Sequence, residues 1–306
     1  MFDTGSMIRV GTIGLACTVL LGAVACKSDM KRAIELVPDD ATVLVGVDVA
    51  ALHESPLGRT MAVRVLHGEL KEACSLGFDA WRSVVMGCDP DRYEETFVLV
   101  VSAEGIGTKT KLECLRSFAE KHLGRNPWTP REHDGRVELD IDFDNGTATG
   151  HVVDGNRLVI APKTQDDAIR ALIAGEGRSA ATHGLADILA RADTSRPLWV
   201  AAKVPAELPP GAPIAGAESV VASVGFPSDM VVSASVVYAS SSDARARADA
   251  AQAEIDEIVT GLGALGIPAK TLQVDVTTRD ERLEVSARLG QDVLESTLAA
   301  SFGALR

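Results

Sequence analysis

Alternating apolar and polar residues mark the strands of this chain. From Val137 to Asp144 apolar and acidic residues alternate without a break, which is typical of a strand with one buried face. The segment 42–49 is rich in β-branched residues and follows Pro38-Asp39-Asp40, so it predicts the first strand. Asn145-Gly146 and Asp154-Gly155 favour hairpin turns. Further strands are expected at 83–87, 96–102, 151–153, 158–161, 198–204, 219–225, 230–238, 272–278 and 282–287.

Helical periodicity separates these strands. Leu112, Leu115 and Phe118 recur on one face of the segment 109–123, and Gly124 is typical of the residue that ends a helix. An Ala-rich segment predicts the longest helix of the chain. The expected helices besides 109–123 are 55–73, 164–175, 182–192, 242–260 and a last one around 294–302.

The order of these elements predicts two related halves, residues 37–178 and 179–306. Each half runs through three strands, a helix, two or three further strands and a second helix. Because hairpins dominate, the sheets should be mostly antiparallel, with helices packed on one face. The sequence therefore predicts an α+β fold of two halves, whose sheets pack together or fuse.

The N-terminus has the pattern of a secretory leader. Arg9 precedes an uncharged run, Val10–Ala25, whose 16 residues would rise about 24 Å as a helix, too short for the roughly 30 Å of a bilayer core. Small residues lead into Cys26, which resembles a bacterial lipobox. Residues 1–25 are thus expected to be a signal peptide, 26–36 a short tether, and Cys26 the site of lipid attachment. A core helix, an unlipidated leader and a lipobox at Cys17 are the alternatives.

The expected location is the cell envelope. Acyl chains such as palmitate on Cys26 would hold the protein on a membrane, and two chains suffice for stable anchoring. Lys27-Ser28 lacks the Asp that favours retention at the inner membrane, so an outer-membrane destination is favoured.

Three cysteines remain after the expected cleavage, Cys74, Cys88 and Cys114. An oxidising envelope permits one disulfide, and three pairings are possible. A Cys74–Cys114 bond would connect the helix 109–123 to the sheet. Cys88 would then be the unpaired thiol, with no local basic group to make it reactive.

The segment Leu36-Val37-Pro38-x-Asp40-Ala41-x-Val43-Leu44-Val45-Gly46-Val47-Asp48 resembles a group of uncharacterised bacterial lipoproteins. The segment 193–201 is also similar. In that group a Cys precedes a strand hairpin and another lies in the next helix. Cys74 and Cys114 match these positions, so the resemblance supports their pairing, whereas Cys88 departs from the pattern. The resemblance implies location and fold but no activity.

Candidate metal sites and catalytic motifs are weak in this sequence. Asp140, Asp142 and Asp144 alternate as in the start of a calcium loop, but His151 stands where a bidentate Glu belongs. The strand interpretation explains the same residues more simply. No HExxH, GxSxG or CxxC motif occurs, so neither a catalytic site nor a metal site nor a cofactor is predicted.

Composition narrows the possible partners. The chain has 306 residues, with 43 acidic against 30 basic and a formal net charge of −13, which argues against nucleic acid because phosphates require clustered Lys and Arg. We therefore expect a lipid-anchored envelope protein with a non-catalytic binding or structural role, with an envelope protein as a possible partner. A hydrolase using scattered carboxylates and a carrier of an apolar ligand are the alternatives.

Overall fold

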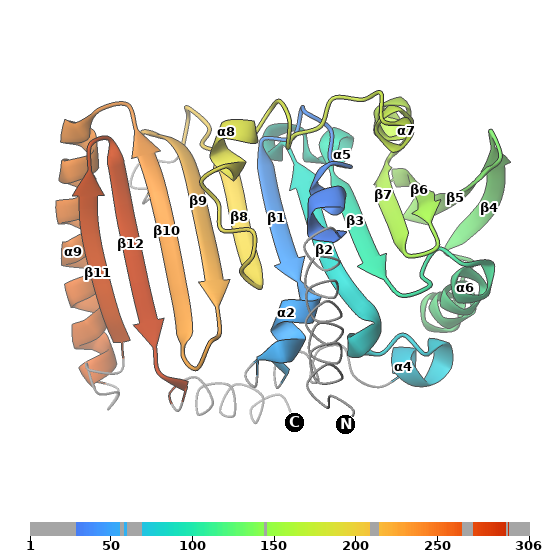
Figure 1. Ribbon diagram of the computed structural model, residues 1–306, viewed down its shortest axis with the longest axis horizontal. Coiled ribbons are helices and arrows are strands. Elements are labelled where there is room, and N and C mark those ends of the chain that lie inside the picture. Colours follow the sequence, from blue (N-terminus) through green and yellow to red (C-terminus); the bar gives the residue numbers. More distant parts are fainter. Residues whose placement is uncertain are drawn as a thin grey trace, which may run out of the picture.

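A computed structural model describes residues 29–55, 58–59, 69–143, 146–208, 214–264, 272–291 and 293. Within these residues the strands form one sheet of 12 strands, in the order β11-β12-β10-β9-β8-β1-β2-β3-β7-β6-β5-β4 (Figure 1). Every neighbouring pair is antiparallel. The prediction of an α+β fold on a mostly antiparallel sheet is therefore confirmed. The strands are β1 (Val43–Asp48), β2 (Trp81–Cys88), β3 (Val98–Ala103), β4 (Trp128–His133), β5 (Arg136–Phe143), β6 (Gly146–Asp154), β7 (Arg157–Pro162), β8 (Leu198–Lys203), β9 (Ala217–Gly225), β10 (Met230–Tyr238), β11 (Leu272–Arg279) and β12 (Arg282–Leu289).

The pairing of β1 with β8 joins the two halves into one sheet. Outward from this joint the order is β1-β2-β3-β7-β6 in the first half and β8-β9-β10-β12-β11 in the second. In each half a long helix follows the third strand. The hairpin β5–β4 is added at the outer edge of the first half.

The two long helices, α6 (Lys109–Leu123) and α9 (Ser241–Ala264), lie on the same face of the sheet. Leu112 of α6 packs against Leu139 of β5, and Ala244 of α9 packs against Leu283 of β12. The shorter α7 (Asp166–Ala174) and α8 (Ala186–Leu189) lie over the opposite face. The remaining helices are α2 (Val49–Glu54), α4 (Glu69–Cys74), α5 (Tyr93–Thr96) and the 3-10 turns η1 (Phe78–Ala80), η2 (Pro90–Arg92) and η3 (Lys163–Gln165).

One register row crosses the whole sheet on the face of α7 and α8. Directly opposed residues of antiparallel strands point to the same face, so the row can be followed from one edge to the other. Its members are Asp275, Ser286, Ser233, Ser223, Trp199, Gly46, Val85, Val100, Val159, His151, Glu138 and Arg131. The row is polar at both ends and apolar in the middle. The main core therefore lies at the middle of the row, and the candidate sites lie at its two ends.

The centre of this face is the main hydrophobic core. Val85, Val100 and Val159 are fully buried there, under Ile169 of α7 and the helical residues 29–34. Met30, Ala33 and Ile34 belong to the same cluster. The segment 26–36, expected to be a tether, is therefore part of the fold from Asp29 onward.

Other boundaries differ from the predictions for local reasons. Asp48 accepts a hydrogen bond from the Ala51 amide and begins α2 before the predicted start at Ser55. The predicted helix 182–192 is helical only over Ala186–Leu189. The strand β4 was not predicted at all. The expected last helix around 294–302 lies outside the described residues. Within the described residues no helix is long and apolar enough to cross a membrane.

Candidate functional site

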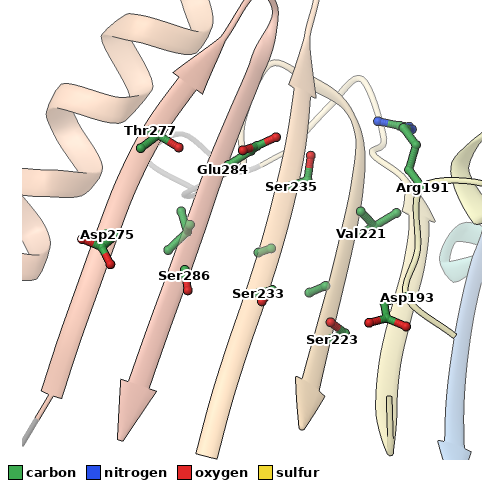
Figure 2. Close-up of a pocket in the computed structure, with 13 residues that line it drawn as sticks. Arg191, Asp193, Val221, Ser223, Ser233, Ser235, Asp275, Thr277, Glu284 and Ser286 are labelled. Carbon is green, nitrogen blue, oxygen red and sulfur yellow. The ribbon is translucent and has the colours of Figure 1, made fainter. Parts of the chain in front are cut away.

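The polar end of the register row in the second half lines a hollow of about 310 Å³. Figure 2 shows hydroxyl side chains from four neighbouring strands on this face of the sheet. Ser223, Ser233, Ser286 and Asp275 lie directly opposite one another across β9, β10, β12 and β11. Two residues along, Ser235, Glu284 and Thr277 form a second polar row.

Most of these side chains are open to solvent, because α9 covers the other face of the sheet, whereas Ser223 is buried. Ser233, Asp275 and Ser286 are exposed, whereas Leu283 beside them on β12 is buried under α9. The hydroxyl groups can each donate and accept a hydrogen bond, and the carboxylates accept. The hollow can thus bind a polar group from several sides.

Charged residues border the hollow from the segment that follows α8. Arg191 donates to the Ser219 hydroxyl at 2.7 Å, and burial together with the neighbouring charge of Arg282 lowers its pKa. Asp193 accepts hydrogen bonds from Ser195 and, at 3.0 Å, from Arg196, and these lower its pKa. Arg191 and Asp193 thus place a positive and a negative charge at the border of the hollow.

The other polar end of the row is a buried charge cluster beneath α7. His151 Nδ1 lies 3.2 Å from Glu138 Oε1, and His151 Nε2 lies 3.1 Å from Asp166 Oδ1. Arg170 forms a bidentate pair with Glu138, at 2.8 and 3.1 Å, and Arg131 lies 2.8 Å from the same carboxylate. The side chains of His151 and Glu138 are only 2% and 4% exposed.

Two arginines pair with the carboxylates around His151. Arg131 and Arg170 offset the negative charges of Glu138 and Asp166, and burial lowers the pKa of the imidazole despite the two carboxylates. The hydrogen bond from Arg170 lowers the pKa of Glu138. Since every member is paired and the imidazole is enclosed, the cluster is a structural ion network that fastens α7 to β4, β5 and β6.

The structure describes two of the three carboxylates of the weak calcium candidate, Asp140 and Asp142. Asp140 lies 3.6 Å from Arg131 and 3.5 Å from Lys163, so cations of the chain already neutralise it. Asp142 is exposed on the same strand, and Asp144 lies outside the described residues. In the part of the chain that the structure describes, no group of three or more His, Cys, Asp or Glu could hold a metal ion.

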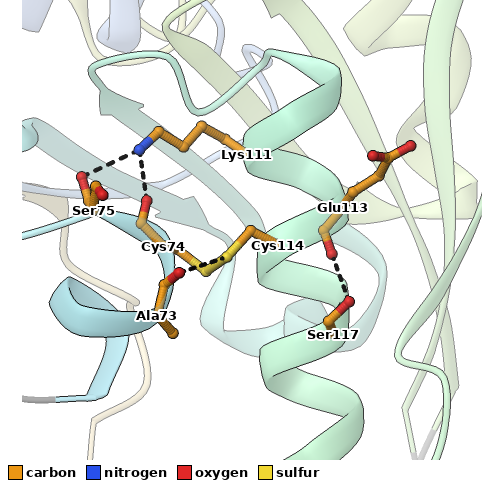
Figure 3. The surroundings of a disulfide bond; sticks show 7 residues. All are labelled: Ala73, Cys74, Ser75, Lys111, Glu113, Cys114 and Ser117. Atoms are coloured by element: carbon orange, nitrogen blue, oxygen red, sulfur yellow. Dashed lines mark hydrogen bonds between the residues drawn. A yellow bond between two sulfur atoms is a disulfide. The ribbon is translucent and has the colours of Figure 1, made fainter.

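The disulfide joins Cys74 at the end of α4 to Cys114 in α6, so the predicted pairing is present (Figure 3). Lys111, one turn before Cys114, donates to the carbonyl groups of Cys74 and Ser75. The covalent bond and this cap hold the end of α4 against α6. Among the described residues Cys88 is a free and buried cysteine.

The predicted lipid attachment site, Cys26, lies outside the described residues, so this prediction stays untested. Neither the hydroxyl groups of the hollow nor the charge cluster was predicted from the sequence. Polar residues at alternate positions in 233–235, 275–277 and 284–286 are the pattern that indicated the hydroxyl groups of the hollow.

The fold and the hollow define an α+β protein with one wide antiparallel sheet and a polar, solvent-open concavity in its second half. No protein-family model and no curated protein matches the sequence. Among solved structures, the chain is similar to crystal form I of TP0453, with a TM-score of 0.53 and 10% sequence identity. The match covers 87% of this chain and 96% of that chain. At this identity the similarity shows a shared fold alone.

Proposed function

We propose that this protein is a lipid-anchored cell-envelope lipoprotein that binds a polar ligand through the hollow of its second half, without catalysing a reaction. The leader with Cys26 and the resemblance to bacterial lipoproteins support the location, with the outer membrane favoured. The open hydroxyl face supports binding, and it is the observation that carries the proposal. The ligand we expect offers several hydroxyl or amide groups.

The chemistry of the hollow is the reason for this ligand class. Ser233, Ser286 and Asp275 lie directly opposite one another on three adjacent strands, so their Cα atoms are about 5 Å apart in the direction of strand pairing. A ligand with polar groups at a similar spacing can bond to each strand in turn. Because the sheet fixes the positions of the side chains, little ordering entropy is lost on binding.

The two alternatives receive less support from the geometry. An apolar carrier requires an enclosed apolar cavity, whereas this hollow is open to solvent and its lining mixes hydroxyl and carboxylate groups with apolar residues such as Val221. His151 is enclosed, both of its ring nitrogens face carboxylates, and Asp140 is held by Arg131 and Lys163. A hydrolase would therefore have to use Asp275 or Glu284 of the hollow as its acid or base.

The test is the mass of the protein purified from native membranes, measured under native and then denaturing conditions. A denatured mass equal to Cys26–Arg306 plus acyl chains, less two hydrogens for the disulfide, supports the anchor. Extra mass under native conditions supports the binding role. An unlipidated mass overturns the anchor, and a native mass without any addition overturns the binding role.

A matched pair of variants links the bound mass to the hollow. Ser286→Trp places an indole in the middle of the polar row, and the bound mass should be lost. Glu132→Trp adds the same side chain at an exposed position of β4, at the opposite edge of the sheet, and the bound mass should remain. Retention by both variants would place the ligand elsewhere.

A further inference from the structure

The point at which the chain enters the fold is fixed by a buried arginine. Arg157, at the start of β7, is 6% exposed and lies 3.2 Å from Asp29 Oδ1 and 3.1 Å from Asp154 Oδ2. After Asp29 the chain continues directly into the core through Met30, Ala33 and Ile34. Asp29 is therefore held at one place on the domain by an ion pair and by the packing of the residues that follow.

This place lies at one end of the strands. The turn 154–157 between β6 and β7 holds Asp154 and Arg157, and the adjacent turn 105–108 bonds to it, since Gly107 donates to the Gly155 carbonyl and Gly105 donates to the Asn156 side chain. We call these two turns the entry end. The register places Asp48 and Leu289 at the same end of their strands, and the β11–β12 turn at the opposite end. In Figure 1 the entry end is the lower edge of the sheet.

The distance from the expected lipid to this end is short. Asp29 is the third residue after Cys26, and a fully extended chain of three residues spans at most about 11 Å. The headgroup region on each side of a bilayer is about 5–8 Å thick. An acylated Cys26 at the boundary of the hydrocarbon would therefore keep Asp29 in or directly above the headgroups, whatever path the three residues take.

We propose that the entry end is the surface of the domain that contacts the lipid headgroups, with the strands directed away from the bilayer. This inference rests on the lipid anchor of the proposed function and adds which surface meets the membrane. The β11–β12 turn would then stand roughly 24 Å farther from the bilayer, since β12 spans seven residue steps of about 3.4 Å. The hollow on β9–β12 would stand beside the bilayer with its polar face open to the aqueous side.

The test uses the full chain purified from native membranes and reconstituted in phosphatidylcholine vesicles with nitroxide quenchers at the headgroup level. A fluorophore is attached at Gly155→Cys in the entry end, where a Cβ atom meets nothing within 4 Å, or at Glu281→Cys in the exposed β11–β12 turn. Cys88 is buried, so it should contribute little labelling. Quenching should be several-fold stronger at position 155 than at position 281.

Equal quenching, or stronger quenching at position 281, would overturn the orientation while leaving the anchor intact. Absence of acyl mass on the same samples would overturn the anchor and, with it, this inference. A third sample carries 20 Gly and Ser residues between Ser28 and Asp29, which extend the tether by about 25 Å on average. If the short tether sets the orientation, quenching at position 155 falls to the level of position 281. Unchanged quenching would show that the three-residue tether does not hold this end at the membrane.

Discussion

Removing the disulfide should destabilise the protein by an amount that the structure predicts. The bond between Cys74 and Cys114 closes a loop with a sequence separation of 40 residues. In the chain-entropy model a closed loop of this size restricts the unfolded chain enough to stabilise the native state by about 4 kcal/mol at 25 °C. We therefore expect Cys74→Ala and Cys114→Ala each to lower the free energy of unfolding by about 4 kcal/mol.

Urea denaturation followed by circular dichroism measures this loss. With a urea m-value of about 3 kcal/mol/M, the midpoint should fall by about 1.3 M in each single variant. The double variant should fall by the same amount as either single variant, because one bond is lost in all three. Reductant should bring the wild-type protein to this level and leave the double variant unchanged.

Cys88→Ala is the matched control, since it removes a buried thiol that forms no bond. Its loss should be smaller and should not respond to reductant. If the losses of the two single variants add in the double variant, or if reductant leaves the wild-type midpoint unchanged, the two sulfurs are not bonded and the reasoning fails.

Three further predictions concern the sheet and its covering. Acidification from pH 7 to 5 should destabilise the fold, because His151 is protonated near pH 6.5 in the unfolded chain while burial keeps its pKa lower in the fold. Glu138, whose pKa is also lowered in the fold, adds a further loss of stability below pH 4.5. A flatter pH profile of the free energy of unfolding in His151→Gln checks the contribution of His151. Gly46→Ala should cost about 1–3 kcal/mol in urea denaturation, because its Cβ would overlap the indole of Trp199, and an unchanged midpoint would contradict this contact. Ile169→Ala, fully buried between α7 and the sheet, should cost about 2–5 kcal/mol in the same assay, and a loss below 1 kcal/mol would mean that α7 packs loosely.

Local patterns predicted the strands and long helices because their signals lie within a few residues of one another. The alternation in 137–144 and the hairpin dipeptides specify β5 and the β6–β7 turn without reference to the rest of the chain. The strand β4 carried no such signal, because it is an edge strand with Pro130 in its middle and mostly exposed side chains. The strand β4 pairs with only one neighbour, β5, and its own sequence does not indicate this pairing.

The residues of the candidate site could not be predicted from the sequence, because pairing between distant strands brings them together. Ser233 and Ser286 face each other only because β10 pairs with β12 in one register, and Asp275 joins them through a second pairing. The charge cluster likewise needed His151, Glu138 and Arg170 from three elements. The pairing of Cys74 with Cys114 was predicted with the support of a resemblance to bacterial lipoproteins, because the cysteine spacing alone leaves three pairings open.

The two halves share a sheet order but differ in what covers the face of the register row. In the first half that face is closed, because the helical residues 29–34, α7 and α8 bury Val85, Val100 and Val159 and enclose the charge cluster. In the second half the equivalent strands β9, β10 and β12 carry Ser223, Ser233 and Ser286 in this row instead of valines, and α9 lies on the other face of the sheet. Apolar residues at these positions would leave an exposed apolar patch, so the polar row is needed wherever the face stays open. Under the proposed function, the first half would provide the point of attachment to the membrane and the second half the surface for binding.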